Sequence, residues 1–300
     1  MLDRDIRDIE GLVHDDVVGL NFVKANPLYV FRRHYRTGLR SHIMAVLDPE
    51  DVRREREGVV SEGVRWYPRA RPIVMLRIFR KRFRNLSHAE EELRSVKTIE
   101  GFLAPEYIAL SNEFLVDLKV RGGSDILLCG LQEYVKGEML DPWGSQDDDF
   151  LKRIRKRPGI GGDKAEGDSG EWLKAVRVEA LVFVESIKKM ATEALRIPDL
   201  AGVGNLLLTE SGRIRLVDIN NVSRVSFGGG IELDDRGYPV CDKSVEALWR
   251  MERFLAGREP DPEDPLYSSY LTATRMKDVK ELERIFHAEQ GRGAPFLGAD

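Results

Sequence analysis

The stretch that decides the fold reads Ile197-Pro198-Asp199-Leu200-Ala201-Gly202-Val203-Gly204-Asn205-Leu206-Leu207-Leu208 and, after Thr209-Glu210-Ser211, continues as Gly212-Arg213-Ile214-Arg215-Leu216-Val217-Asp218-Ile219-Asn220. Two short apolar runs, 205–208 and 214–219, flank turn-forming residues, and this pattern predicts a β-hairpin. A hairpin holds its two outer ends together, so Asn205 and Asp218 are expected to lie close to each other. Both residue types are also common turn formers, which is the ordinary alternative.

Composition limits the classes of function. The 300 residues are 42% hydrophobic and 33% charged, which suits a sizeable core in two domains or one large two-lobed unit. The formal net charge is -4. This balance opposes a dedicated nucleic-acid binder, although a short basic run occupies 80–84. We therefore expect no nucleic-acid partner.

The cysteines and histidines indicate neither a disulfide framework nor a zinc site. Cys129 and Cys241 lie in apolar surroundings and predict two buried free thiols in a reducing cytosol. The five histidines are scattered without metal-ligand spacing. The start of the chain lacks a basic leader before an apolar run, and the apolar stretch 178–194 contains too many charges to span a membrane. We expect a cytoplasmic protein with no membrane partner.

Apolar periodicity predicts a β-rich first part and a helical second part. Ser87 is expected to cap the first helix, with Glu90 as its capping-box partner. In the first part we expect strands at 29–31 and 42–47 around a turn at 36–38, a strand at 73–79, a helix from Ser87 to Leu103, and strands at 107–120 and 125–135. In the second part we expect a Gly-rich connection at 144–171 with a short helix at 148–155, a long buried helix at 171–195, the hairpin, and helices at 244–255 and 276–287.

The stretch from 197 to 220 resembles the catalytic and metal-binding loops of the protein kinase-like superfamily, which contains eukaryotic-type protein kinases and aminoglycoside phosphotransferases. Those enzymes carry an Asp, an Asn that opens a short strand, a hairpin, and an Asp that ends the second strand. The resemblance covers roughly residues 70 to 255. It implies an α+β, two-lobed kinase-like fold, with an N-terminal antiparallel β-sheet lobe and one helix at 1–134 and a mainly helical C-terminal lobe at 135–300.

The same resemblance implies the chemistry of the site. Asp199 would be the catalytic general base or would orient the acceptor hydroxyl. Asn205 and Asp218 would hold Mg²⁺, a hard cation that prefers oxygen ligands. ATP would be the phosphate donor, and phosphoryl transfer would depend on positioning and charge neutralisation.

Two further segments resemble the nucleotide contacts of the family. Residues 131–140 resemble the hinge, where Glu133 and Val135 would meet adenine through their backbones; an edge strand followed by a turn is the alternative. Residues 74–79 resemble the third strand, where Arg77 stands in place of the family's lysine. Arginine keeps the charge but not the geometry of a lysine.

Lys81 would replace Arg77 if the strand register differs, and Glu92 would be the glutamate partner on the following helix. A solvated strand end is the alternative for these basic residues. Asp242, before the helix at 244–255, resembles the buried aspartate that orients the catalytic loop, and a helix N-cap is its alternative role.

Several positions depart from the family pattern. Asp199 lies six residues before Asn205, and Leu200 occupies the expected position, so the glycines of the loop would have to absorb one extra residue. Ile197-Pro198 replaces the usual His-Arg, and Asn220 replaces a glycine. No glycine-rich phosphate loop is present: Gly38 is alone, and the glycines at 159–164 lack P-loop spacing.

Two functions follow from the resemblance and its departures. The first is a kinase-like, ATP- and Mg²⁺-dependent phosphotransferase that acts on an unidentified hydroxyl acceptor, either a small molecule or a protein. The alternative is a pseudokinase, a nucleotide-binding or scaffolding module without phosphoryl transfer. Nucleic-acid binding through residues 80–84 is opposed by the net charge.

Overall fold

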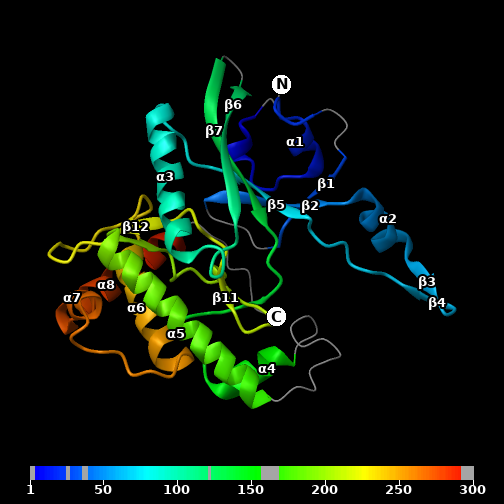
Figure 1. Ribbon diagram of the computed structural model, residues 1–300. Coiled ribbons are helices and arrows are strands. Elements are labelled where there is room, and N and C mark those ends of the chain that lie inside the picture. The colour runs from blue at the N-terminus through cyan, green and yellow to red at the C-terminus, as the bar shows by residue number, and fades with distance from the viewer. Residues whose placement is uncertain (1–3, 25–27, 36–39, 121–122, 157–168, 292–300) are drawn as a thin grey trace. The chain divides into compact units, whose positions relative to one another are not determined.

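The computed structural model combines an antiparallel sheet with several helices, as expected of an α+β chain (Figure 1). It divides into two compact units, and the boundary falls inside one helix. Unit 1 comprises Met1–Arg94 and Ala109–Tyr134, and unit 2 comprises Ser95–Ile108 and Val135–Asp300. The structure describes residues 4–24, 28–35, 40–120, 123–156 and 169–291.

Unit 1 is built on a five-stranded sheet in which every pairing of neighbours is antiparallel. The strands at 29–31, 42–47 and 73–79 are confirmed, whereas the strand expected from Tyr107 begins only at Ser111. The expected turn at 36–38 lies outside the described residues. The strand order is β1 (Val30–Arg33), β2 (Ser41–Leu47), β5 (Val74–Phe79), β7 (Gly123–Glu133) and β6 (Ser111–Val120).

Both faces of this sheet are apolar because side chains alternate along each strand. Ile78 faces a cluster formed with Ile6 and Val17, from the short helices η1 (Ile6–Asp8) and α1 (His14–Val18). Phe79 faces the opposite cluster, with Ala89 of the helix that follows β5. The N-terminal segment, in which no helix or strand was expected, therefore covers one face of the sheet.

A buried arginine fastens that N-terminal segment. Arg7 is 2% exposed, and its Nη2 contacts Asp5 Oδ2 at 2.7 Å and Asp125 Oδ2 at 2.5 Å. Arg82 also reaches Asp5, at 2.8 Å. Burial alone would raise the pKa of Asp5, but the hydrogen bonds and charges of Arg7 and Arg82 lower it to about 2.

The charged segment 48–58, for which no element was expected, forms helix α2 (Pro49–Glu57). Asp48 caps it by accepting a hydrogen bond from the amide of Glu50 at 2.7 Å, and proline suits the first helical position. A two-stranded hairpin follows, β3 (Val59–Ser61) and β4 (Val64–Trp66), with every residue exposed. Figure 1 shows this arm extending away from the five-stranded sheet.

Helix α3 (Leu86–Leu103) begins one residue before the predicted cap, so the prediction that Ser87 caps it is wrong. Asn85 Oδ1 accepts a hydrogen bond from the amide of His88 at 2.9 Å and takes that role. The first turns of α3 belong to unit 1 and its last turns to unit 2, where Val96 and Leu103 are buried.

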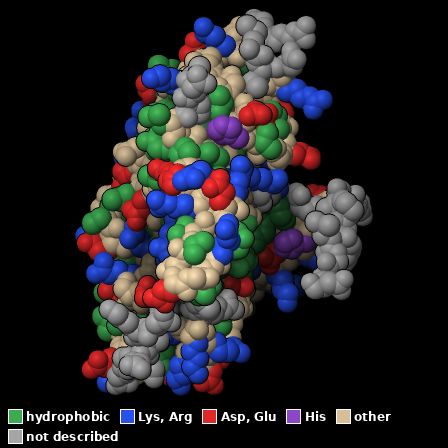
Figure 2. All heavy atoms as spheres, turned by 90° about the vertical axis from the view of Figure 1, so that its right-hand side faces the viewer, with side chains coloured by type: hydrophobic (Ala, Val, Ile, Leu, Met, Phe, Trp, Pro, Cys, Tyr) green, Lys and Arg blue, Asp and Glu red, His purple; other side chains and the backbone are tan. Residues whose placement is uncertain are grey.

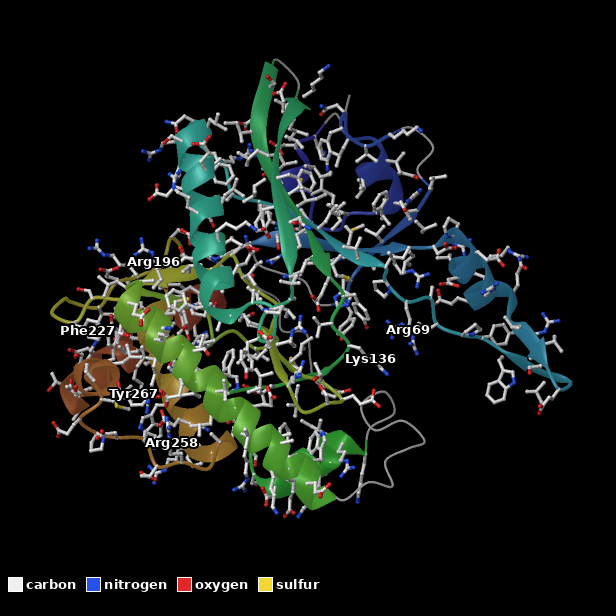
Figure 3. The ribbon with its side chains drawn as sticks, viewed as in Figure 1. Arg69, Lys136, Arg196, Phe227, Arg258 and Tyr267 are labelled. Carbon is white, nitrogen blue, oxygen red and sulfur yellow. The ribbon has the colours of Figure 1, made fainter. Side chains whose placement is uncertain are left out.

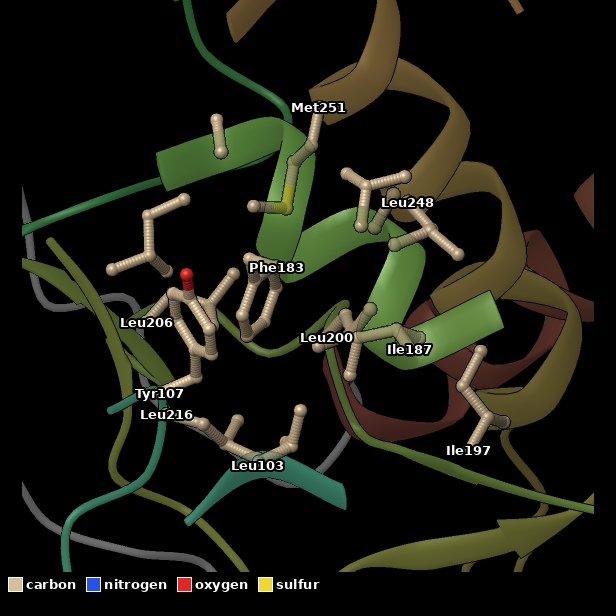
Figure 4. Close-up of a cluster of buried hydrophobic side chains, with 14 of the residues drawn as sticks. Leu103, Tyr107, Phe183, Ile187, Ile197, Leu200, Leu206, Leu216, Leu248 and Met251 are labelled. Atoms are coloured by element: carbon tan, nitrogen blue, oxygen red, sulfur yellow. The ribbon is translucent and has the colours of Figure 1, made fainter. Parts of the chain in front are cut away.

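Unit 2 is organised around the long helix α5 (Ser169–Glu193), which was expected at 171–195. The buried side of this helix carries Phe183 and Ile187. These side chains lie in one core with Leu200 and Leu206 (Figure 4). The other helices of unit 2 are α4 (Asp148–Arg155), α6 (Val240–Arg250), the π-helical turn η2 (Met251–Leu255), α7 (Pro265–Tyr270) and α8 (Ala273–Gly291), and α4, η2 and α7 pack against α5.

The predicted hairpin is present as β10 (Leu206–Leu208) and β11 (Ile214–Leu216). Its turn uses Gly212 at a φ of +84°, a conformation that favours glycine. Three short strands of unit 2 were not expected from the sequence. They are β9 (Arg196–Pro198) and β12 (Val222–Arg224), which pair with each other, and β8 (Glu138–Met139), which pairs with β10.

A buried glutamate on the π-helical turn is surrounded by partners. Glu252 is 1% exposed and accepts from Lys188 at 2.7 Å, from Arg258 at 2.7 Å and from the hydroxyl of Tyr267 at 2.6 Å. Figure 3 labels Arg258 and Tyr267, which lie on the same side of unit 2. Because its partners satisfy the carboxylate, we interpret this cluster as structural.

The surface is mixed in charge. On the face drawn in Figure 2, acidic and basic side chains are interspersed and form no field of one sign. Both cysteines are buried and free. Among the described residues, no helix is long and apolar enough to cross a membrane.

The Asp5 carboxylate predicts a pH dependence for unit 1. A pKa lowered to about 2 contributes stability that is present above the ordinary value of 3.8 and is lost as the pH falls toward 2. Asp5→Asn should lower the free energy of unfolding by about 1–2 kcal/mol near neutral pH, with the difference shrinking below about pH 4. Urea unfolding of both proteins over a pH series measures this. A difference that stays constant with pH would contradict it.

Candidate functional site

The loop between β9 and β10 folds around the carboxylate of Asp199. Its Oδ1 accepts hydrogen bonds from the amides of Ala201 and Gly202, both at 3.0 Å. The amide of Asn205 then donates to the carbonyl of Gly202 at 3.1 Å. Because the loop makes two consecutive turns, Asn205 returns to a position beside Asp199, although the two lie six residues apart in the sequence.

The side chain of Asn205 points back to the start of the loop. Its Nδ2 donates to the backbone carbonyl of Asp199 at 2.9 Å. The amide lies so close to Gly202 that a Cβ there would be 2.4 Å from Nδ2. Glycine at 202 is therefore required by close approach, and the structure places Asn205 beside Asp199.

Asp218 lies at the same end of the hairpin. The amide of Val217 donates to the carbonyl of Asn205 at 2.8 Å, which aligns the two ends. The charge of Asp218 also acts on Asp199 and raises its pKa. Unit 2 thus brings Asp199, Asn205 and Asp218 together.

The electrostatics of Asp199 favour its protonated form. Burial raises the pKa of this half-buried carboxyl, and the negative charge of Asp218 raises it further. Hydrogen bonds from Asn221 and from the amides of Ala201 and Gly202 act in the opposite direction. The net pKa lies above the usual range, which is the direction expected of a group that takes up a proton.

The donor set fits a hard cation. Two carboxylates are close enough to repel each other, and Asn205, whose Nδ2 is used as a donor, still carries a carbonyl oxygen. Oxygen ligands of this type suit Mg²⁺. Among the described residues, no group of three His, Cys, Asp or Glu side chains could hold a metal, so Asn205 would be a necessary member of the set.

The buried side chain of Asn220, two residues after Asp218, adds polar atoms near this end of the hairpin. It is 6% exposed, and neither atom of its side-chain amide has a hydrogen-bond partner within the described residues. A buried amide without partners costs about 1–3 kcal/mol, so this position would gain from a water or ligand atom.

Three residues that sequence reasoning missed hold the loop. Asn221 Nδ2 donates to Asp199 Oδ2 at 2.9 Å, and the amide of Leu200 donates to Ser244 Oγ at 3.1 Å. Trp143 Nε1 donates to the carbonyl of Ala201 at 2.8 Å. Only Asn221 could have been suspected, because it follows the motif directly; Ser244 and Trp143 arrive from distant segments.

Asp242 has neither of the roles expected for it. It lies inside the first turn of α6, after the N-cap residue Pro239, so the N-cap prediction is wrong. Both carboxylate oxygens accept from Arg275, at 2.5 and 3.2 Å, and Ser244 is the α6 residue that bonds the loop. Burial raises the pKa of Asp242, and the pairing with Arg275 opposes that effect.

The two candidate phosphate-binding residues of unit 1, Arg77 and Lys81, lie in different environments. Arg77 is 2% exposed with its guanidinium 5.2 Å from the ring of Phe79, so a solvated strand end is wrong for this residue. Glu92 Oε2 receives the ammonium of Lys81 at 2.5 Å. Lys81 lies two residues beyond the end of β5, and it is the residue that forms the predicted ion pair with Glu92.

The predicted adenine contacts lie at the end of β7. Glu133 is the last residue of that strand, and its amide already donates to the carbonyl of Leu110 at 2.8 Å. Its Oε2 accepts from the amide of Leu110 at 3.2 Å. Val135 is the first residue of unit 2 after the strand. Roles for both in nucleotide binding stay predictions.

Comparison with known proteins gives little support to the resemblance to the kinase-like superfamily. No protein-family model and no curated protein matches the chain. Among solved structures, the chain is similar to the ROP18 kinase domain in complex with AMP-PNP and sucrose, with 10% identity and a TM-score of 0.36, over 89% of this chain and 83% of that one. Similarity at this level does not establish a shared fold, so the function proposed below rests on this chain's own residues.

Close packing over Gly202 predicts the effect of a single methyl group. Gly202→Ala should displace the Asn205 amide from the carbonyl of Asp199 and lower the free energy of unfolding by about 1 kcal/mol, the value of one hydrogen bond. Gly228→Ala, where a Cβ would meet nothing within 4 Å, is the matched control. Urea unfolding compares them. Equal stability of the two variants would contradict the packing described.

The raised pKa of Asp199 predicts a second pH effect. A carboxyl whose folded pKa lies above its ordinary value of 3.8 destabilises the folded state once ionised, so this cost is absent below 3.8 and grows as the pH rises through the folded pKa. Asp199→Asn should therefore gain stability relative to the wild type as the pH rises. Urea unfolding across the pH range tests this, and a gain that falls with rising pH would refute it.

Proposed function

We propose that this chain is an ATP- and Mg²⁺-dependent phosphotransferase that acts on a hydroxyl acceptor. One observation carries the proposal: the loop and hairpin of unit 2 gather a carboxyl of raised pKa, a second carboxylate and an amide oxygen at one point. This set can hold a hard cation and accept a proton, which are the two requirements of phosphoryl transfer to an alcohol.

Each residue has a distinct role in this proposal. Asp199 would orient the acceptor hydroxyl and accept its proton. Asp218 and the carbonyl oxygen of Asn205 would hold Mg²⁺, and the bond from Asn205 Nδ2 to Asp199 would fix the distance between metal and base. Bound Mg²⁺ would supply charge neutralisation to the phosphates.

The remaining parts of the proposal rest on the sequence resemblance alone. Contacts of Arg77, Lys81, Glu92, Glu133 and Val135 with ATP stay predictions, as does a cytoplasmic location. The acceptor is unidentified and could be a small molecule or a protein.

The alternative, a pseudokinase that binds nucleotide without transferring phosphate, has its own observation. Both oxygens of Asp199 already accept hydrogen bonds, two at Oδ1 and one at Oδ2. These bonds use three of the roughly four acceptor positions of an ionised carboxylate, so substrate has a single position left, at Oδ2, to which it could deliver a proton. The missing glycine-rich loop and the arginine at position 77 favour the same alternative.

Metal-dependent nucleotide binding is the first test. ATP with Mg²⁺ should stabilise the wild type, by about 2.7 kcal/mol at one hundred times the dissociation constant, and Asp218→Asn should abolish the metal-dependent part. Glu210→Gln, at the exposed opposite end of the same hairpin, is the control and should behave as wild type. Thermal unfolding with ATP, with and without Mg²⁺, measures this. No stabilisation of the wild type would reject the phosphotransferase and a nucleotide-binding pseudokinase, and would leave only a scaffolding module.

Phosphoryl transfer separates the two functions. Incubation with labelled ATP and Mg²⁺, followed by measurement of ADP release and of label on the protein or on added alcohols, should show turnover in the wild type and not in Asp199→Asn. Turnover that survives this substitution would contradict the role of Asp199. Binding without any turnover would favour the pseudokinase.

A further inference from the structure

A cavity with both charged and apolar lining lies within unit 2. It occupies about 260 Å³ and is lined by the first turns of α6, the end of α7 and the side of α8 that carries Val279 and Glu283. Ligand pockets for drug-sized molecules usually begin near 300 Å³, so this cavity suits something smaller. Its walls combine charged side chains of both signs with an apolar surface.

A buried ion cluster forms one wall of the cavity. Lys243 is 7% exposed, and its ammonium contacts Glu246 Oε2 at 2.7 Å and Glu283 Oε2 at 3.2 Å. The same ammonium lies 4.1 Å from the ring centre of Trp143. Glu283 Oε1 accepts from the hydroxyl of Tyr238 at 2.7 Å. Lys243 and Glu283 are therefore fully engaged.

Two charged groups of the lining are not engaged. Within the described residues, Glu246 Oε1 accepts no hydrogen bond and the exposed ammonium of Lys280 has no ion-pair partner. One is a carboxylate oxygen on α6, and the other is a cation on α8 at the edge of the cavity. The cavity thus offers one acceptor and one donor of opposite charge.

The charges of the lining balance. Asp242 is neutralised by Arg275 outside the cavity lining. The remaining charged residues are Glu246 and Glu283 against Lys243 and Lys280. The lining has no net charge, but its free carboxylate oxygen and free ammonium are separate groups. Such a lining favours a ligand that is neutral overall and charged at both ends, because a ligand with one charge would leave one of these two groups without a partner.

Apolar side chains supply the rest of the lining. Val279 is 5% exposed, and Met276 is 43% exposed at the rim. Leu271 and the ring of Tyr270 also line the cavity. These groups would bury the hydrocarbon part of a ligand and thereby contribute to binding.

We propose that this cavity binds a small zwitterion, an amino acid-like molecule whose ammonium meets Glu246, whose anionic end meets Lys280, and whose hydrocarbon part lies against Val279 and Met276. This proposal does not rest on the function proposed above, although Trp143 and α6 contact both the loop of Asp199 and the cavity lining.

Calorimetric binding to the full chain tests the proposal with four probes. L-leucine and 6-aminohexanoate are zwitterions with short and long charge separations, 3-methylbutylamine carries only the cation, and 4-methylpentanoate carries only the anion. At least one zwitterion should bind more tightly than both singly charged probes. Removing one charged partner should weaken that zwitterion by about tenfold, the equivalent of about 1.4 kcal/mol.

The variants are Glu246→Gln and Lys280→Gln. Exposed neighbours on α8 that do not line the cavity provide matched controls, Lys277→Gln for the cation and Asp278→Asn for the acid. Both controls, and Asp218→Asn in the nucleotide site, should bind as wild type. Saturable binding by neither zwitterion, equal binding of the amine or the acid, or indifference to both variants would each overturn the proposal.

Discussion

The carboxylate of Asp199 is the interaction on which the site depends. By accepting two backbone amides through one oxygen and Asn221 through the other, it shapes the loop that returns Asn205 to its own carbonyl. The same bonds that build the loop stabilise the negative charge that burial and Asp218 oppose. The hydrogen bonds that shape the loop therefore also set the pKa of Asp199, so a change to these bonds alters both the loop and that pKa.

Unit 1 depends on a different constraint, the need to cover both faces of its sheet. Ile78 and Phe79 point to opposite faces of the sheet, and both side chains are almost fully buried. Both faces are therefore covered by other parts of the chain. The N-terminal segment closes one face and α3 the other. Arg7 fixes the position of the N-terminal segment on the sheet because its ion pair with Asp125 joins the segment to β7.

The sequence predicts elements well where one residue type dominates the local physics. The hairpin, the long helix and the strand at 73–79 follow from apolar periodicity and turn residues, and the proximity of Asn205 and Asp218 follows from the hairpin. Partners that depend on distant segments could not be read in this way. Trp143 and Ser244 reach the loop from other elements, and the pairing of Asp242 with Arg275 depends on how α6 packs against α8. Likewise, α2 was missed because its charges, paired along the helix, resemble a polar loop in the sequence.

Trp143 joins the loop of Asp199 to the ion cluster of Lys243, in addition to the bond between the loop and Ser244 of α6. Its indole N–H is bonded to the loop of Asp199 at Ala201, while the face of its ring lies beside the ammonium of Lys243. The position therefore requires both a hydrogen-bond donor and a broad aromatic face; phenylalanine would supply only the face, and tyrosine would carry its donor at a different point of the ring. Natural variation at residue 143 should accordingly be narrow, and a change there would need simultaneous changes in the loop and in the ion cluster to be tolerated.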